Sequence, residues 1–286
     1  MKWYGVIAAL AFVAWDGPVQ GQALDQRFQN LARQTAVGVG GFTGAVRPLK
    51  GPVTLAYGPS APRTQQFATL ISTGGALVRI SVRADLSRHA TAVGMLMSAT
   101  TLRDLTVEYL IAADGVTITH EALPNGTSVL VSTDRRGAIR DALILPPVAD
   151  PAASVPQPGS RGFLEAVNRF PLPVLVRENA VQDTDIFLPV TFPLGAVAGF
   201  ELVRGAGPRL RGEVDCKIGT CLLVEVDEET LFTGKDRSVR GSAVGHMLIG
   251  VDPVHVVSVF LNLRSEIRSQ GRTQIIRSIL VNKTID

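Results

Sequence analysis

Apolar and polar residues alternate in short runs through the first half of the chain. Alternation with a period of two is typical of strands that bury one face. Short turn signals separate the runs, as at Asn125-Gly126, and this spacing predicts an antiparallel sheet of hairpin-connected strands. The alternating runs occupy residues 76–84, 105–112, 116–120, 128–133 and 138–145.

The second half of the chain contains further apolar runs with strand-like composition, so it is also expected to be mainly β. Between the halves, residues 146–160 contain five prolines among small residues and almost no charge, which is a linker composition. We therefore predict a mainly β fold with two antiparallel β-rich domains, sandwich- or barrel-like, and a few short helices. The predicted domains are 24–145 and 161–286.

Four segments depart from the strand pattern or leave it ambiguous. Residues 24–34 place apolar side chains at helical intervals, which predicts a short amphipathic helix. Residues 162–170 follow Ser160, which can cap a second short helix. Residues 87–101 fit either a helix or a buried strand, and both alternatives place them in the core. The acidic run 226–230 is expected to form a solvated turn.

The amino terminus has the features of a signal peptide. One positive charge at Lys2 precedes thirteen apolar residues, 3–15, and a small-x-small site follows at 21–23. A membrane anchor is the alternative, but a helix needs about 20 residues to cross a hydrocarbon core of about 30 Å. We predict a signal peptide over 1–23, no transmembrane segment in the mature chain, and a periplasmic or extracellular location.

Composition and charge argue against nucleic-acid binding. The net charge is +3, from 28 basic and 25 acidic residues, and only 6% of the residues are aromatic. The basic residues are spread singly along the chain, whereas nucleic-acid binding needs clustered positive charge, often with aromatic stacking platforms. We therefore expect a protein or cell-envelope partner and no nucleic acid.

The two cysteines of the chain, Cys216 and Cys221, lie between two strand-like runs. The four residues between them include Gly219, and this arrangement predicts a β-hairpin. In an oxidising compartment the two thiols would form a disulfide across that hairpin, and this structural role is the one we predict. The alternatives are a redox pair, which usually has C-x-x-C spacing at a helix start, and half of a zinc site completed by His246 and His255.

The same region carries a resemblance to a known family. Phe192-Pro-Leu-Gly195, an alternating strand and the C-x4-C pair follow one another within residues 187–250. This combination resembles the invasion-associated locus B family of exported bacterial proteins. The second cysteine pair that the family usually carries near its amino terminus is missing from this sequence. The resemblance implies a periplasmic or surface-associated protein, linked in some pathogens to host-cell entry and without a defined enzymatic activity.

The sequence contains no recognisable catalytic, metal-binding or cofactor-binding motif. The segment 241–245 lacks the G-x-S-x-G spacing, and the glycines at 38–44 lack the dinucleotide-binding spacing. We therefore predict an exported binding protein without catalytic residues, metal or cofactor. One alternative is a structural subunit of a cell-envelope assembly, and a second is a periplasmic enzyme whose site residues are scattered in the sequence.

Overall fold

The computed structural model describes residues 18–36, 42–55, 58–73, 76–91, 95–111, 117–121, 124–133, 139–152, 179–183, 201–204, 207–251 and 254–285. These residues form one helix, α2 (Pro18–Ala36), and thirteen strands. The strands are β1 (Thr43–Arg47), β2 (Ser60–Thr73), β3 (Ala76–Ala90), β4 (Leu96–Ile111), β5 (Thr117–Glu121), β6 (Ser128–Thr133), β7 (Ile139–Leu145), β8 (Glu201–Arg204), β9 (Arg209–Cys216), β10 (Gly219–Gly234), β11 (Arg237–Val251), β12 (Val254–Ser269) and β13 (Arg272–Thr284).

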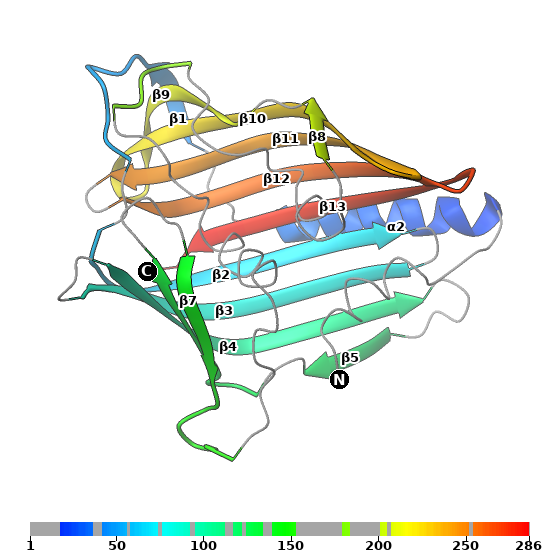
Figure 1. Ribbon diagram of the computed structural model, residues 1–286, viewed down its shortest axis with the longest axis horizontal. Coiled ribbons are helices and arrows are strands. Elements are labelled where there is room, and N and C mark those ends of the chain that lie inside the picture. Colours follow the sequence, from blue (N-terminus) through cyan, green and yellow to red (C-terminus); the bar gives the residue numbers. More distant parts are fainter. Residues whose placement is uncertain are drawn as a thin grey trace.

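All thirteen strands belong to one antiparallel sheet (Figure 1). Its main path is β1-β9-β10-β11-β12-β13-β2-β3-β4-β6-β7, while β5 pairs with β4 and β8 pairs with β10. Within the described chain the path is open, because β1 pairs only with β9 at one end and β7 only with β6 at the other. The predicted class, mainly β and antiparallel with little helix, is confirmed, and its architecture is one large open sheet.

Strands from both halves of the chain are hydrogen-bonded to each other in this sheet. The central junction is the pairing of β13 with β2, from Arg277↔Ser72 to Thr284↔Gln65. Most of the predicted linker lies outside the described residues, so the division into domains at 146–160 stays a prediction. The described residues show that both predicted domains contribute strands to a single sheet.

The alternating runs of the first half form strands as predicted, in β3, β4, β5, β6 and β7. Residues 87–101 complete the end of β3 and the start of β4, so the strand alternative is the right one for them. The predicted helix at 24–34 is confirmed as part of α2. Residues 1–17 of the predicted signal peptide and the predicted helix at 162–170 lie outside the described residues.

The register of the strands defines two chemically different faces, because paired residues of neighbouring strands point to the same side. One row, called here the inner face, crosses the sheet through Val224, Met247, Val259, Asn282, Phe67 and Val82. The adjacent row points to the opposite side, called the outer face, through Glu225, His246, Phe260, Val281, Ala68 and Ser81. The inner face is mainly apolar, and the outer face carries most of the charged side chains.

Helix α2 covers part of the outer face (Figure 1). Phe28 and Ala32 lie one turn apart on the helix and are buried against apolar side chains of β2, β3 and β13. An ion pair between Asp25 and Arg277 also joins the helix to β13. These contacts all follow the predicted cleavage site after Ala23, so a chain that begins at Leu24 retains them. The side chains of the sheet in this cluster are Leu70, Leu77, Ile279 and Val281.

We predict that Phe28→Ala lowers the free energy of unfolding by about 3 kcal/mol, because it removes the aromatic ring that α2 buries against the sheet. Gln29→Ala, a change at the exposed neighbouring position of the same helix, is the control and should alter stability by less than about 0.5 kcal/mol. Urea unfolding followed by circular dichroism measures both. Equal effects of the two changes would show that α2 does not dock through Phe28.

Candidate functional site: the inner face of the sheet

The predicted disulfide is present between Cys216 at the end of β9 and Cys221 near the start of β10, with an S–S distance of 2.03 Å. The hairpin is tighter than predicted. The strands pair as far as Cys216↔Gly219, so a two-residue turn, Lys217-Ile218, replaces the expected four-residue loop. Gly219 has a φ of 112°, which glycine adopts without steric cost, and this allows β10 to begin directly after the turn.

The disulfide has a structural environment. Cys221 is fully buried, and both cysteines pack in an apolar cluster on the outer face with Val214, Leu223 and Leu248. The zinc alternative for the cysteines involved His246 and His255, which also lie on the outer face. Among the described residues, no group of three or more His, Cys, Asp or Glu side chains is arranged to hold a metal ion.

His246 lies between two aromatic rings, with ring centroids 5.8 Å from Phe42 and 6.1 Å from Phe260. Burial lowers the pKa of its imidazole below the usual value, so the ring is neutral at neutral pH. Its Nε2 atom has no hydrogen-bond partner among the described residues. His255 is buried, and its ring lies directly over Gly250, where a Cβ atom would clash with it.

The acidic run 226–230 is not the solvated turn that was predicted. It lies in the middle of β10, where successive side chains alternate between the two faces. Asp227 and Glu229 are exposed on the outer face, and Arg240 donates a 3.1 Å hydrogen bond to Glu229. Glu228 points to the inner face and is only 3% exposed. Three consecutive acidic residues resemble a loop by composition, but the alternation of the flanking strand continues through them.

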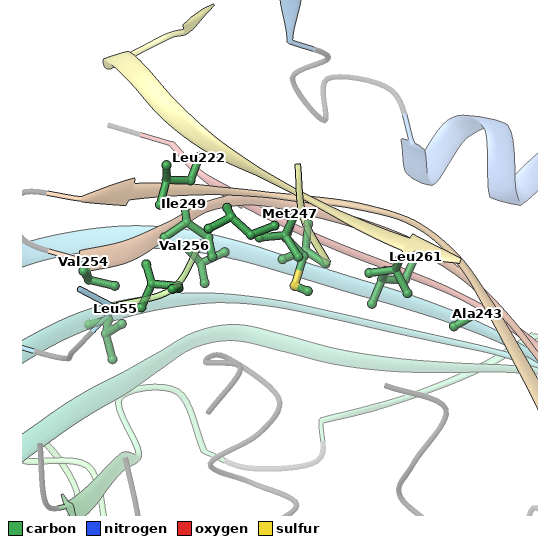
Figure 2. Close-up of a cluster of buried hydrophobic side chains, with 14 of the residues drawn as sticks. Leu55, Leu222, Ala243, Met247, Ile249, Val254, Val256 and Leu261 are labelled. Carbon is green, nitrogen blue, oxygen red and sulfur yellow. The ribbon is translucent and has the colours of Figure 1, made fainter. Parts of the chain in front are cut away.

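At one end of the sheet the inner face is fully buried (Figure 2). The main core cluster contains Leu222, Met247, Ile249 and Leu261 from the central strands together with residues of β3 and β4. Two non-strand segments, 49–55 and 179–183, contribute to this cluster and are joined by backbone hydrogen bonds between Val53 and Ala180. They close the inner face at this end, where Leu55 is 2% exposed.

Farther along the strands, part of the inner face is incompletely covered, although Val78 at the far end of β3 is fully buried. Eight apolar side chains on four adjacent strands point to this face and remain partly exposed, although similar residues nearer the closed end are buried. Four strands at the usual spacing extend over about 14 Å. We call these residues the apolar belt: Leu263 and Ile267 of β12, Ile276 and Leu280 of β13, Phe67 and Ile71 of β2, and Ile80 and Val82 of β3.

Polar side chains lie where the apolar belt meets the closed end. β13 pairs with β12 only as far as Lys283↔Ser258, so side chains complete the hydrogen bonding beyond that point. The carbonyl oxygen of Val256 accepts hydrogen bonds from Gln65 Nε2 and from Thr284 Oγ1, both at 3.2 Å. Arg88, 2% exposed, donates through Nη1 to the carbonyl oxygen of Val254 at 3.3 Å.

Two amide oxygens in this polar region are buried without hydrogen bonds. Gln65 Oε1 and Asn282 Oδ1 have no partner among the described residues, and each residue is only 1% exposed. Asn282 pairs with Phe67 and Gln65 pairs with Thr284, so the two amides are diagonal neighbours on the inner face. Such neighbours have Cα atoms roughly 7–8 Å apart.

The outer face has a hollow of its own beside the end of α2, with a volume of about 320 Å³. Arg79 lines it and is paired with Glu108 through a 2.6 Å hydrogen bond, which raises the pKa of the guanidinium. The hollow is lined mainly by polar side chains, unlike the apolar belt. Its lining residues are Gln34, Thr35, Gln66, Ala68, Arg79, Ser81, Val281 and Lys283.

Comparisons with known proteins identify no family for this chain: no family model matches it, and no curated protein matches it. The similarity to the invasion-associated locus B family therefore stays a prediction. Two solved structures are similar in part. A lipovitellin structure, described by its lipid–protein interactions, has a TM-score of 0.38 at 6% identity over 80% of this chain and 25% of its own. A DUF1329 family protein from Desulfovibrio piger has a TM-score of 0.29 at 12% identity, over 79% of this chain and 86% of its own chain.

The chain thus spans about a quarter of the lipovitellin chain that it matches. Among the described residues, no helix has the length and the apolar character to span a bilayer.

The apolar belt and the buried amides were missed by the sequence analysis. The alternation of Gln65, Phe67, Thr69 and Ile71 along β2 was the available signal, but only the register with β13 shows which residues share a face.

Replacing Cys216 and Cys221 with serine should lower the free energy of unfolding by about 2 kcal/mol, because the bridge closes only a short loop. Thermal unfolding with and without reductant measures the effect, and the double variant should be insensitive to reductant. A wild-type protein whose unfolding is unchanged by reduction would contradict a stabilising role for the bridge.

Proposed function

We propose that this chain is an exported binding protein of the cell envelope that holds an apolar, chain-like ligand against the apolar belt and catalyses no reaction. The observation that carries the proposal is the belt itself, a group of eight partly exposed apolar side chains on the inner face of the sheet. Partly exposed apolar surface of this kind is stabilised when a ligand covers it. Valine, leucine, isoleucine and phenylalanine side chains bind apolar surface but cannot transfer protons, which favours binding over catalysis.

The expected affinity follows from the area that a ligand can cover. Burial of about 400 Å² of apolar surface, counted on both partners, contributes about 10 kcal/mol. Loss of translational and rotational freedom opposes this by about 4 kcal/mol or more. The remainder of about 6 kcal/mol corresponds to a dissociation constant of tens of micromolar. Apolar ligands with longer chains should bind more tightly.

The cell-envelope location is supported by the disulfide and by the predicted signal peptide. Disulfides form and persist in oxidising compartments such as the bacterial periplasm and are rare in the cytosol. Cys216 and Cys221 are paired in the structure. An association with host-cell entry, which the family resemblance implies, remains part of the proposal.

A structural subunit of an envelope assembly is the second candidate, and strand β7 favours it. This strand lies at the end of the sheet and pairs only with β6 in the described chain. Leu143 and Leu145 are 45% and 37% exposed on its outer face. An edge strand with exposed apolar side chains can pair with another chain. A subunit of this kind would assemble through β7 without needing the apolar belt.

Two adjacent isoleucines of β13 provide a matched test of the binding site. Ile276 belongs to the apolar belt, whereas Ile275 points to the outer face and is 39% exposed. We predict that Ile276→Thr weakens binding of the apolar fluorophore N-phenylnaphthylamine about fivefold, because about 1 kcal/mol of apolar burial is lost. Ile275→Thr should leave it unchanged. Wild-type affinity in the Ile276 variant would remove the belt as the binding site.

Export can be tested on the full chain expressed in a Gram-negative host. We predict that the protein is recovered from the periplasmic fraction, that its sequence begins at Leu24, and that Cys216 and Cys221 are joined. Mass spectrometry of the intact protein, before and after alkylation without reductant, measures both features. A cytoplasmic protein that begins at Met1 and has two free thiols would contradict export.

A further inference from the structure

Asn282 occupies a position where an apolar residue would be more stable. Its side chain points to the inner face, between Val259 of β12 and Phe67 of β2 in register, and is 1% exposed. It makes no hydrogen bond to the described residues, and its Oδ1 atom is fully buried. A buried amide oxygen without a partner costs about 1–3 kcal/mol relative to a paired one. The fold therefore gains nothing from this amide that a leucine would not supply.

Gln65 differs from Asn282, because half of its amide has a structural role. Its Nε2 atom donates to the carbonyl oxygen of Val256, and this bond fixes which atom of the amide is the oxygen. The Oε1 atom then points away from that bond and has no partner among the described residues. Two hydrogen-bond acceptors are thus buried side by side at the end of the apolar belt, next to Phe67.

We propose that this pair of amides binds the head group of the ligand, and that the ligand is an amphiphile whose head group donates hydrogen bonds, such as a primary amide or a hydroxyl. The inference rests on the proposed function, since the apolar belt would hold the chain of the same ligand. Carbonyl oxygens accept hydrogen bonds and cannot donate them. A head group with N–H or O–H donors satisfies both oxygens, whereas one that only accepts leaves Gln65 Oε1 unpaired, because the bond to Val256 holds the nitrogen of that amide in place.

Arg88 is the charged group that a carboxylate head group would prefer, and it lies in the same polar region, because its acceptor Val254 is two residues before Val256 on β12. It is 2% exposed, and its Nη1 atom already donates to Val254. It lies on β3 four residues beyond Ala84, the partner of Gln65, which is about 13 Å along a strand. A ligand whose carboxylate binds Arg88 is therefore the alternative, and the experiment includes a carboxylate for this reason.

Three dodecyl compounds distinguish a head group that donates hydrogen bonds from one that only accepts them and from a carboxylate. Their binding is measured by displacement of N-phenylnaphthylamine from the wild-type protein. Dodecanamide has two N–H donors, N,N-dimethyldodecanamide has the same chain and carbonyl without donors, and dodecanoate at about pH 8 is an anionic acceptor. We expect dodecanamide to bind about three- to tenfold more tightly than the dimethyl compound, the range that one or two net hydrogen bonds allow. Equal binding of the two amides, or tighter binding of dodecanoate, would overturn the inference.

Variants of the two amide residues test whether these side chains cause the preference for dodecanamide over the dimethyl compound. Asn282→Leu should reduce the preference for dodecanamide and leave binding of the dimethyl compound unaffected, because Gln65 Oε1 remains as an acceptor. Asn262→Leu is the matched control, because Asn262 is exposed on the outer face of β12 and should leave both affinities unchanged. Gln65→Met is a second variant with the same expectation, since Thr284 still donates to Val256. A donor preference that survives undiminished in the double variant Asn282→Leu/Gln65→Met would overturn the inference.

Failure of the proposed function gives a different result. If none of the three compounds displaces the fluorophore from the folded protein, no apolar ligand binds to the belt, and the head-group site fails together with it. If all three bind equally, the apolar belt is supported and the amide site alone is overturned.

Discussion

The pairing of β13 with β2 is the interaction on which the rest of the structure depends. Eight residue pairs join the last strand of the chain to the second, across a separation of about two hundred positions. This ladder places the strands of the second half beside those of the first and makes their inner faces continuous. It also juxtaposes Phe67 with Asn282 and Leu70 with Ile279, which brings together the apolar belt, the buried amides and the surface on which α2 docks. Such long-range pairing is entropically costly to form and must be repaid by the apolar surface that it buries.

The sequence predicted those features of the fold that depend on local patterns. Alternation and turn residues located β3 and β5 to β7, and helical spacing located the part of α2 that contacts the sheet. The cysteine spacing predicted the bridge, although the strands extend two residues farther into the hairpin than expected. Composition was misleading at Glu228, where three acidic residues in succession indicated a turn and the strand continues through them. A short polar run within a long strand is decided by its register with the neighbouring strands, which no local pattern contains.

The candidate site could not be predicted in the same way. Ile276 belongs to the belt and Ile275 does not, yet the two are identical neighbours in the sequence, and only the position of β12 distinguishes them. Asn282 precedes the last two residues of a strand and would be expected at a frayed end, but β2 covers it on one side and β12 on the other. The site is a property of the face, and the face exists only when strands from the two ends of the chain are paired.

The inner face combines two kinds of surface that contribute differently to recognition. The apolar belt provides affinity without direction, because hydrophobic burial depends on area and not on orientation. An amide provides direction, because its hydrogen bonds are satisfied only by a donor at the right position and angle. Natural sequences tend to depart from local stability rules at functional positions. Asn282 is such a departure, since its buried oxygen is unpaired in the fold, and a donor on the proposed ligand would recover that free energy only when its chain lies along the belt.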